Sequence, residues 1–292
     1  MSNDAWKAAA MRESMKNKST LVSLVHPLLL KANEESSALR DTKHFHPSSM
    51  CKRDWCTRET AYKVMGFTES NPERPKPFRT LNIFEEGNRI HSKWQGWFKD
   101  LGILRGKWLC HECEHTWYGS GTCESCQSKQ VEYLEVPVTN KELNILGHAD
   151  GHIIMPDGSD ALIEIKSMGI GTFRYEAPQL FNQYAHKEIT AEEMWKDVKR
   201  PFPSHLRQGS LYMYCTGIHT MVFIYEWKAG QDVKEFTVQY QPEVISDILY
   251  NCGSLDSDLK ADRLPDRPSW AEFKSKTPCK YCAYKDLCWE SS

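Results

Sequence analysis

Apolar and polar positions repeat with two different periods along this chain, and the periods predict a mixed α/β fold. Residues 81–104 have helical spacing, whereas residues 131–167 alternate as strands do. The pair Asp157-Gly158 is typical of a tight turn between two strands. The later elements are predicted at 190–216 (helix), 219–227 and 234–240 (strands) and 242–251 (helix).

Composition shifts divide the chain into segments. Residues 1–44 are rich in Ala, Lys and Glu and predict an N-terminal helical segment. Four prolines predict an irregular stretch over residues 45–80. A Cys-rich insert at 108–130 separates the two parts of the main domain, 45–107 and 131–292. The prolines are Pro47, Pro72, Pro75 and Pro77.

The segment LNILGHADGHIIMPDGSDALIEIKS carries the clearest chemical signal. Successive side chains of a strand alternate faces, so Glu164 and Lys166 project to one side. Ile163 and Ile165 then point into the core. A carboxylate and an ammonium on an otherwise apolar strand are costly to bury, and metal binding supplies a reason for them.

Asp150 precedes this strand, and a hairpin can bring it beside Glu164. Two carboxylates can hold a hard cation, which polarises a phosphate and lowers the pKa of a bound water. Lys166 would orient that water and neutralise developing charge. Asp157 also follows a proline, but we expect it to face solvent at the hairpin tip. The alternative is a surface hairpin with incidental charges.

Four ordered motifs resemble the RecB-like branch of the PD-(D/E)xK nucleases. They are a helix-borne His91 after a glycine, G-x-x-D-G at Asp150, E-x-K at Glu164, and Q-x-x-x-Y from Gln208 to Tyr212. The resemblance implies a restriction-endonuclease-like mixed sheet flanked by helices. It also implies that His91 is a third protein ligand to the metal, and that Gln208 and Tyr212 position the active site and the DNA. An ordinary helix histidine and simple helix amphipathicity are the alternatives.

Three cysteines cluster in the tail, at Cys279, Cys282 and Cys288. Clustered thiols in a cytosolic protein favour metal ligation, and thiolate sites usually have four ligands. Either Cys51 or Cys56 could supply the fourth.

The tail is similar to the iron–sulfur subgroup of the RecB-like nucleases, which includes CRISPR-associated adaptation nucleases and many bacteriophage exonucleases. In that subgroup one N-terminal cysteine joins three C-terminal ones around a 4Fe–4S cluster. The pattern continues with an arginine, an aromatic residue and a glycine, which Arg58, Tyr62 and Gly66 match after Cys56. Cys51 with Arg53 matches only the first part, so Cys56 is the predicted ligand. A zinc site is the rival interpretation.

A second cysteine set lies in WLCHECEHTWYGSGTCESCQ. Two CxxC turns each present two thiolates to one ion, which predicts a structural zinc ribbon. His111 and His115 could substitute as ligands, although four thiols suffice. The insert could bind DNA or a partner, or only add stability. The four thiols belong to Cys110, Cys113, Cys123 and Cys126.

Net charge and hydropathy limit how the protein can contact DNA and whether it can enter a membrane. The formal net charge is −2, so DNA contact must come from local basic patches. The longest apolar stretch, 21–30, is too short for a bilayer and lacks signal-peptide flanks, so we expect a cytoplasmic protein. Two basic stretches flank the proposed cluster ligands and could track a phosphate backbone. They comprise Lys52, Arg53, Arg58, Lys63, Arg74, Lys76 and Arg79, then Lys274, Lys276, Lys280 and Lys285.

Together these features predict a Mg²⁺- or Mn²⁺-dependent DNA exonuclease of a phage or prokaryote, acting on single strands or DNA ends. The 5′ to 3′ polarity comes from the resemblance alone. One alternative is a CRISPR adaptation nuclease that trims spacer precursors. Another is a non-catalytic DNA-binding subunit. The sequence leaves open a replication or recombination partner and a homo-oligomer.

Overall fold

The computed structural model describes residues 20–72 and 75–290, which form two compact units. One unit contains the described parts of 1–43, 56–88 and 264–292, and we call it the terminal unit. The other contains 44–55 and 89–263, and we call it the sheet unit. Part of the predicted N-terminal segment, residues 1–19, and the basic residue Arg74 lie outside the described residues.

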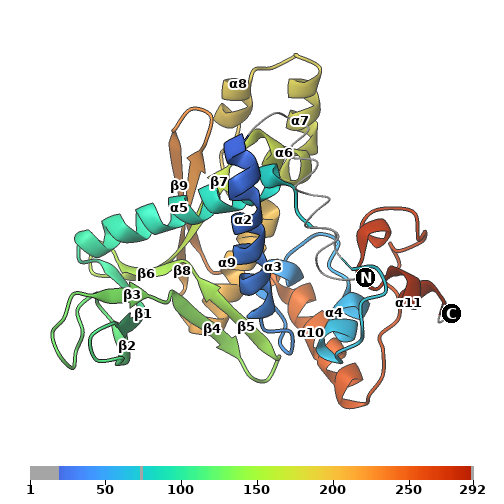
Figure 1. Cartoon of the computed structure of the whole chain (residues 1–292), viewed down its shortest axis with the longest axis horizontal. Coiled ribbons are helices and arrows are strands. Elements are labelled where there is room, and N and C mark those ends of the chain that lie inside the picture. The colour runs from blue at the N-terminus through green and yellow to red at the C-terminus, as the bar shows by residue number, and fades with distance from the viewer. Residues whose placement is uncertain (1–19, 73–74, 291–292) are drawn as a thin grey trace. The chain divides into compact units, whose positions relative to one another are not determined.

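The sheet unit is built on a mixed sheet with the strand order β2-β1-β6-β7-β8-β9 and with β3 paired to β1 (Figure 1). Only the β7–β8 pair is parallel, and the others are antiparallel. Strands β4 (Val136–Asn140) and β5 (Ile145–Ala149) pair separately. The strands of the main sheet are β1 (Leu104–Cys110), β2 (Thr116–Gly119), β3 (Val131–Tyr133), β6 (Gly151–Ile154), β7 (Asp160–Met168), β8 (Thr220–Trp227) and β9 (Val233–Gln239).

Helices cover this sheet, which confirms the predicted mixed α/β class. Residues 190–216 form two helices rather than the single predicted one, because Pro201 and Pro203 interrupt the hydrogen-bond ladder. The helices of the sheet unit are α3 (Pro47–Met50), the later part of α5 (Phe78–Asp100), α6 (Ile170–Glu176), α7 (Pro178–Ala185), α8 (Ala191–Lys196), α9 (Pro203–Thr216), η1 (Pro242–Val244) and α10 (Ser246–Lys260).

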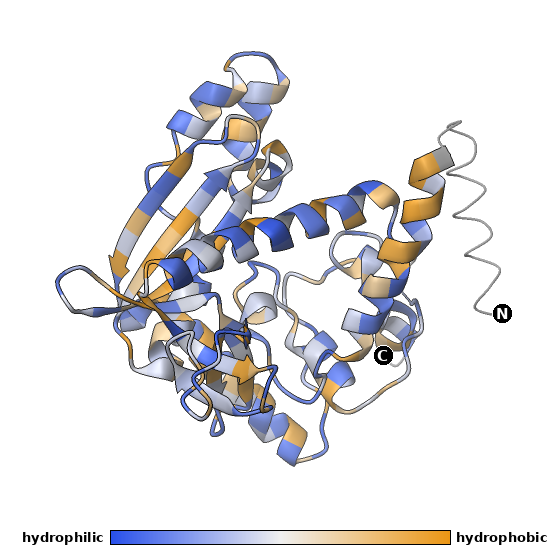
Figure 2. Cartoon of the chain, turned by 60° about the vertical axis from the view of Figure 1, so that its left-hand side comes forward, coloured by the Kyte–Doolittle hydropathy of each residue, from blue (hydrophilic) through white to orange (hydrophobic). Residues whose placement is uncertain are grey.

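Strand β7 is buried on both faces, and each face meets a different hydrophobic cluster. Leu162 belongs to the cluster under α9, whereas Ile163 and Ile165 belong to the cluster under α5. Both isoleucines are fully buried, as predicted, and each such burial contributes roughly 1.5–3 kcal/mol. Figure 2 shows apolar residues concentrated on the strands and polar residues on the turns.

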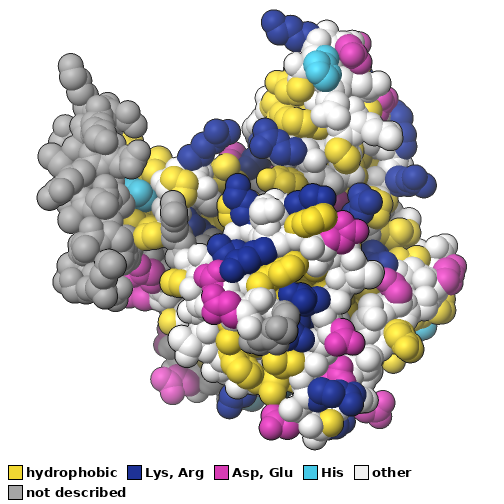
Figure 3. Space-filling model, turned by 90° about the vertical axis from the view of Figure 1, so that its right-hand side faces the viewer, with side chains coloured by type: hydrophobic (Ala, Val, Ile, Leu, Met, Phe, Trp, Pro, Cys, Tyr) yellow, Lys and Arg dark blue, Asp and Glu magenta, His cyan; other side chains and the backbone are white. Residues whose placement is uncertain are grey.

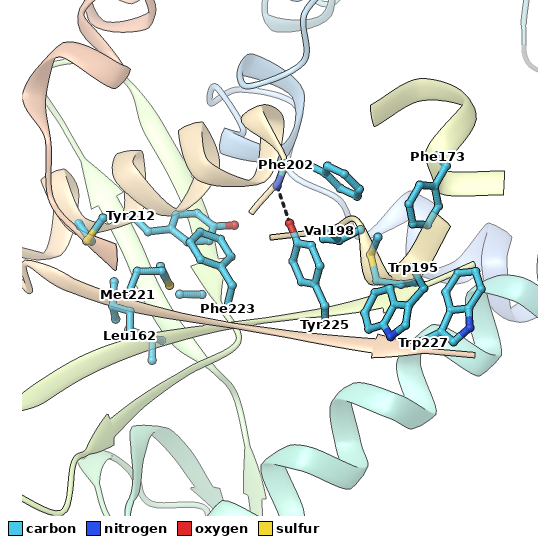
Figure 4. Packing of buried hydrophobic residues seen from close by; sticks show 14 of the residues in the cluster. Leu162, Phe173, Trp195, Val198, Phe202, Tyr212, Met221, Phe223, Tyr225 and Trp227 are labelled. Carbon is cyan, nitrogen blue, oxygen red and sulfur yellow. Dashed lines mark hydrogen bonds between the residues drawn. The ribbon is translucent and has the colours of Figure 1, made fainter. Parts of the chain in front are cut away.

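Aromatic packing fixes the α9 side of the sheet (Figure 4). The Trp195 ring stacks on Trp227 with their centroids 5.4 Å apart. The backbone N–H of Phe202 donates to the Tyr225 hydroxyl at 2.9 Å, just before α9 begins. This contact ties the start of α9 to β8, and so it sets where the side chains of α9 fall along the sheet.

The terminal unit joins segments that are distant in sequence. It contains α2 (Thr20–Ala38), α4 (Thr57–Val64), η2 (Cys279–Tyr281) and α11 (Lys285–Glu290). The Tyr62 ring stacks on Tyr284 with their centroids 5.2 Å apart, and the Asn71 side chain donates to the Cys282 carbonyl at 3.1 Å.

The prediction of an irregular 45–80 stretch is wrong in part. Pro47 stands in the first turn of α3, where a proline is tolerated, and Cys56 caps α4.

Within the described residues no helix is long and apolar enough to cross a membrane.

Candidate active site

Strand β7 brings Glu164 and Lys166 to one face, as the alternation predicts. The Lys166 Nζ lies 2.6 Å from Glu164 Oε1. Glu164 is only 3% exposed, and its Oε2 has no hydrogen-bond partner among the described residues. Burial raises the pKa of Glu164, whereas the Glu164 and Asp150 carboxylates raise the pKa of Lys166 against its own burial. An orphaned, buried carboxylate oxygen is costly unless something binds it.

Asp150 lies between β5 and β6, and the β6–β7 hairpin carries it to β7. Its Oδ2 accepts a hydrogen bond from the backbone N–H of Ile165 at 2.6 Å. The hairpin packs closely at the next residue, because a Cβ at Gly151 would lie 2.6 Å from the buried Ile163 side chain. Asp157 is exposed in the turn instead, where its Oδ1 accepts from the Ser159 N–H at 2.9 Å.

Helix α5 supplies His91, whose Nδ1 lies 3.1 Å from Asp150 Oδ1. Burial alone would lower the pKa of His91, but the hydrogen bond and charge of Asp150 raise it. One turn later, Gln95 Nε2 donates to the Asp150 carbonyl at 2.9 Å. Trp94 Nε1 donates to Glu226 Oε2 at 2.7 Å, which fixes this part of α5 against β8.

Helix α9 closes the site through Gln208 and Tyr212. Lys166 Nζ donates to Gln208 Oε1 at 3.1 Å, and Gln208 Nε2 donates to the Tyr212 hydroxyl at 2.7 Å. Burial raises the pKa of Tyr212 well above its usual value, so the hydroxyl stays protonated. The helix approaches β8 closely, because a Cβ at Gly209 would lie 2.6 Å from the Phe223 ring. A continuous chain of polar contacts therefore runs from Glu164 to Tyr212.

The sequence interpretation missed Glu135. One ligand atom from each of His91, Glu135 and Asp150 lies within 4.8 Å of the others, an arrangement that could hold a metal ion. Burial raises the pKa of Glu135 to about 7, and the Asp150 charge adds to this effect. Glu135 stands in the linker between β3 and β4, outside any recognisable motif, so no sequence signal marks it.

A cavity of about 920 Å³ opens beside Lys166 and Gln208. Lys52, Arg53 and Arg207 line it, and Arg207 also pairs with Asp247 at 2.7 Å. The carboxylates of Asp54, Glu176 and Asp247 line it as well, so the cavity is of mixed charge, and it reaches the polar chain of the site.

The Cys-rich insert brings its four thiols together. The Cys110 and Cys126 sulfurs are 3.6 Å apart, as are the Cys113 and Cys123 sulfurs, and all four lie within 4.8 Å of one another. A tetrahedral zinc with Zn–S bonds of about 2.3 Å requires sulfur separations of about 3.8 Å. The four thiols fit such an ion.

Two similar turns present these thiols. The residue after each second cysteine is left-handed, with φ 56° at Glu114 and 59° at Gln127. The N–H of each donates at 2.9 Å to the carbonyl of the first cysteine of its pair. His111 lies near Glu132, and His115 stacks on Trp117, so neither belongs to the four-thiol group. Strand β1 carries Cys110 and also pairs with β6, so the insert continues the main sheet.

The tail cysteines lie in the terminal unit together with Cys56. Burial raises the pKa of Cys56 to about 11, and the charge of Cys288 adds to this. Burial likewise raises the pKa of Cys282 to about 12, with contributions from Cys56 and Cys288. Burial raises the pKa of Cys279, and the charge of Cys288 adds to this. Cys51 instead lies in the sheet unit and lines the cavity.

The surface view in Figure 3 shows lysine and arginine side chains interspersed with carboxylates and apolar groups. In the tail, Lys274 pairs with Asp286 at 2.9 Å. The basic stretches are therefore partly neutralised by neighbouring acids.

No protein-family model and no curated protein matches the sequence. Solved structures give faint likenesses. The alkaline exonuclease LHK-Exo of Laribacter hongkongensis shares 14% identity over 78% of this chain and 93% of its own, with a TM-score of 0.42. The same exonuclease in complex with dAMP shares 12% identity over 75% of this chain and 89% of its own, with a TM-score of 0.41. A protein named SSO0001 shares 13% identity over 90% of this chain and 96% of its own, with a TM-score of 0.42. Likeness at this level assigns neither a family nor an activity.

Proposed function

We propose that this protein is a metal-dependent nuclease that hydrolyses phosphodiester bonds in DNA. One observation carries the proposal. The ligand atoms of His91 and Asp150 lie 3.1 Å apart. The buried Glu164 on β7 interacts electrostatically with both, and its Oε2 has no hydrogen-bond partner among the described residues. Lys166 stands beside them. This ligand set with an adjacent lysine is the one expected of a PD-(D/E)xK site.

The residues fit a divalent cation. Carboxylate oxygens suit Mg²⁺ and Mn²⁺, and an imidazole makes Mn²⁺ at least as suitable. Asp150, Glu164 and His91 would hold the ion, which would supply Lewis-acid chemistry at the scissile phosphate. The orphaned Glu164 oxygen would then gain a ligand bond in place of its missing hydrogen bond.

Lys166 would act on the phosphate or on the attacking water. Its ammonium stays charged, because Glu164 and Asp150 hold its pKa above the usual value. Gln208 accepts one of its protons, and Tyr212 holds Gln208 in turn. A fixed ammonium in a poorly hydrated site stabilises developing negative charge more strongly than one in water does. Gln208 and Tyr212 are thus positioning residues for Lys166.

The cations that line the cavity support a nucleic acid end as the substrate. Lys52 and Arg53 line it together with Lys166, so a strand that entered it would meet cations on the way to the site. We therefore propose exonucleolytic action on single strands or DNA ends. The 5′ to 3′ polarity is proposed on the resemblance alone.

The two cysteine sets are proposed to have different metals. The four ribbon thiols match the spacing of one zinc ion, and residues 108–130 are proposed as a zinc-bearing insert. Cys56, Cys279, Cys282 and Cys288 are proposed to hold a 4Fe–4S cluster. Their common place in the terminal unit supports this assignment, although among the described residues no three of the four sulfurs lie within 4.8 Å of one another.

End-labelled single- and double-stranded DNA, incubated with the protein and Mg²⁺ or Mn²⁺, tests the proposal. We expect metal-dependent release of short products from linear DNA and none from circular single strands. Glu164→Gln should abolish cleavage, and the exposed-turn variant Asp157→Asn should not. Equal activity of the two variants, or activity without a divalent ion, would contradict the assignment.

A further inference from the structure

We propose that Glu135 is an additional direct ligand of the divalent ion and that the strand returning from the Cys-rich insert positions it. This inference rests on the proposed function, because it concerns the same metal ion. It adds a ligand that the motifs do not contain, and it gives the insert a role in the chemistry.

Geometry carries the first step. Ligand atoms of Glu135, His91 and Asp150 lie within 4.8 Å of one another, so one ion can touch all three after small adjustments. Asp150 itself is 8% exposed, and Glu164 beside it contributes the orphaned oxygen. The ligand group is therefore partly enclosed, and Glu135 approaches it from an element that carries none of the motif residues.

Charge balance carries the second step. The charge of Asp150 acts on both Glu135 and Glu164, and Lys166 pairs with Glu164. His91 must be neutral to ligate a metal. Carboxylates that lie around one another in a largely buried group favour a bound cation, which lets them stay ionised. Without a cation, Glu135 would only add repulsion to an already crowded group.

Backbone hydrogen bonds hold Glu135 in position beside His91 and Asp150. The N–H of Lys107 donates to the Glu135 carbonyl at 2.8 Å, and the N–H of Leu134 donates to the Lys107 carbonyl at 2.8 Å. Glu135 adopts a left-handed conformation with φ 62°, which is uncommon for a residue that is not glycine. Strain of this kind persists only where the surroundings impose it.

The insert provides those surroundings. Strand β3 ends at Tyr133 and pairs with β1, where Val131 lies opposite the thiol residue Cys110. Tyr133 crosses so closely that a Cβ at Gly106 would lie 2.6 Å from its ring. Its hydroxyl donates to the Arg105 carbonyl at 2.9 Å. The pairing that begins at a cysteine of the insert thus ends two residues before Glu135.

Direct measurement of Mn²⁺ affinity on the full chain tests this, by calorimetric titration or by the EPR signal of free Mn²⁺. Glu135→Gln preserves shape and removes the charge, so it should fold as the unaltered protein does, which circular dichroism checks. We expect it to weaken Mn²⁺ binding at least about tenfold, since even residues behind the ligands cost 10–100-fold. Glu132→Gln is the matched control, because Glu132 is exposed on β3, the strand that leads to Glu135.

A second variant tests the role of the insert. Cys113→Ser should lose zinc and weaken Mn²⁺ binding to the same degree as Glu135→Gln, and the double variant should be no weaker than either. Mn²⁺ affinity that is unchanged in Glu135→Gln but lost in Asp150→Asn and Glu164→Gln would overturn the Glu135 ligand and leave the nuclease proposal standing. Mn²⁺ binding that is absent, or that is independent of Asp150 and Glu164, would overturn both.

Discussion

Binding of a divalent cation should raise the melting temperature of this protein through Glu164. The carboxylate is 3% exposed, and one of its oxygens is unpaired, so the metal-free state carries a buried polar atom that costs roughly 1–3 kcal/mol. An ion that binds only the folded state at 100 times its Kd adds about 2.7 kcal/mol. Each kcal/mol moves the Tm of a domain of about 150–250 residues by about 2–4 °C. The expected increase is therefore about 5–11 °C.

The assay is a thermal melt of metal-free protein with increasing Mn²⁺. Glu164→Gln should lose the increase, because a neutral amide is a poor ligand, while its Oε1 can still accept from Lys166 as Glu164 does. Its metal-free Tm should be lower than that of the unaltered protein, because the Lys166 ammonium loses its carboxylate partner. Asp157→Asn should keep the full increase. The reasoning is refuted if Glu164→Gln gains as much from Mn²⁺ as the unaltered protein, or if Asp157→Asn gains nothing.

Three further outcomes are expected. Lys166→Met should abolish cleavage and keep the Mn²⁺-dependent rise in Tm, because Lys166 is not a metal ligand. A correctly folded variant that loses both would count against a role of Lys166 apart from metal binding. Protein purified without oxygen should contain iron and sulfide plus about one zinc by elemental analysis, and Cys282→Ser should lose the iron alone. Cys113→Ser should lose the zinc and keep a folded sheet with reduced but measurable cleavage, because its thiol closes only a local loop; a melt as early as that of Cys282→Ser would show that the insert is integral to the fold.

The sequence could predict the contacts made along β7 because a strand has a fixed period. Glu164 and Lys166 had to share a face, and the fully buried Ile163 and Ile165 had to share the other. The helical spacing of Gln208 and Tyr212 similarly predicted one face of α9, where the two side chains are hydrogen bonded. Local periodicity was enough for both pairs.

The sequence could not predict features that depend on tertiary crossings. Glu135 reaches His91 and Asp150 only because β3 folds back on β1, and no local pattern encodes that return. The division of residues 190–216 into α8 and α9 was signalled by Pro201 and Pro203, yet the apolar spacing on both sides masked it. Cys51 and Cys56 lie close in sequence, but only the structure assigns them to different units.

The two carboxylate oxygens of Asp150 each have a different partner, one in the core of the fold and one in the proposed site. Oδ2 accepts from the backbone N–H of Ile165, a residue whose side chain is fully buried in the core. Oδ1 faces His91 on α5. The same side chain thus fixes the position of β7, and with it the flanking Glu164 and Lys166, relative to the helix that carries the imidazole. A carboxylate with this double role needs no separate scaffold, because the hydrogen bond that stabilises the strand also orients the proposed metal ligand.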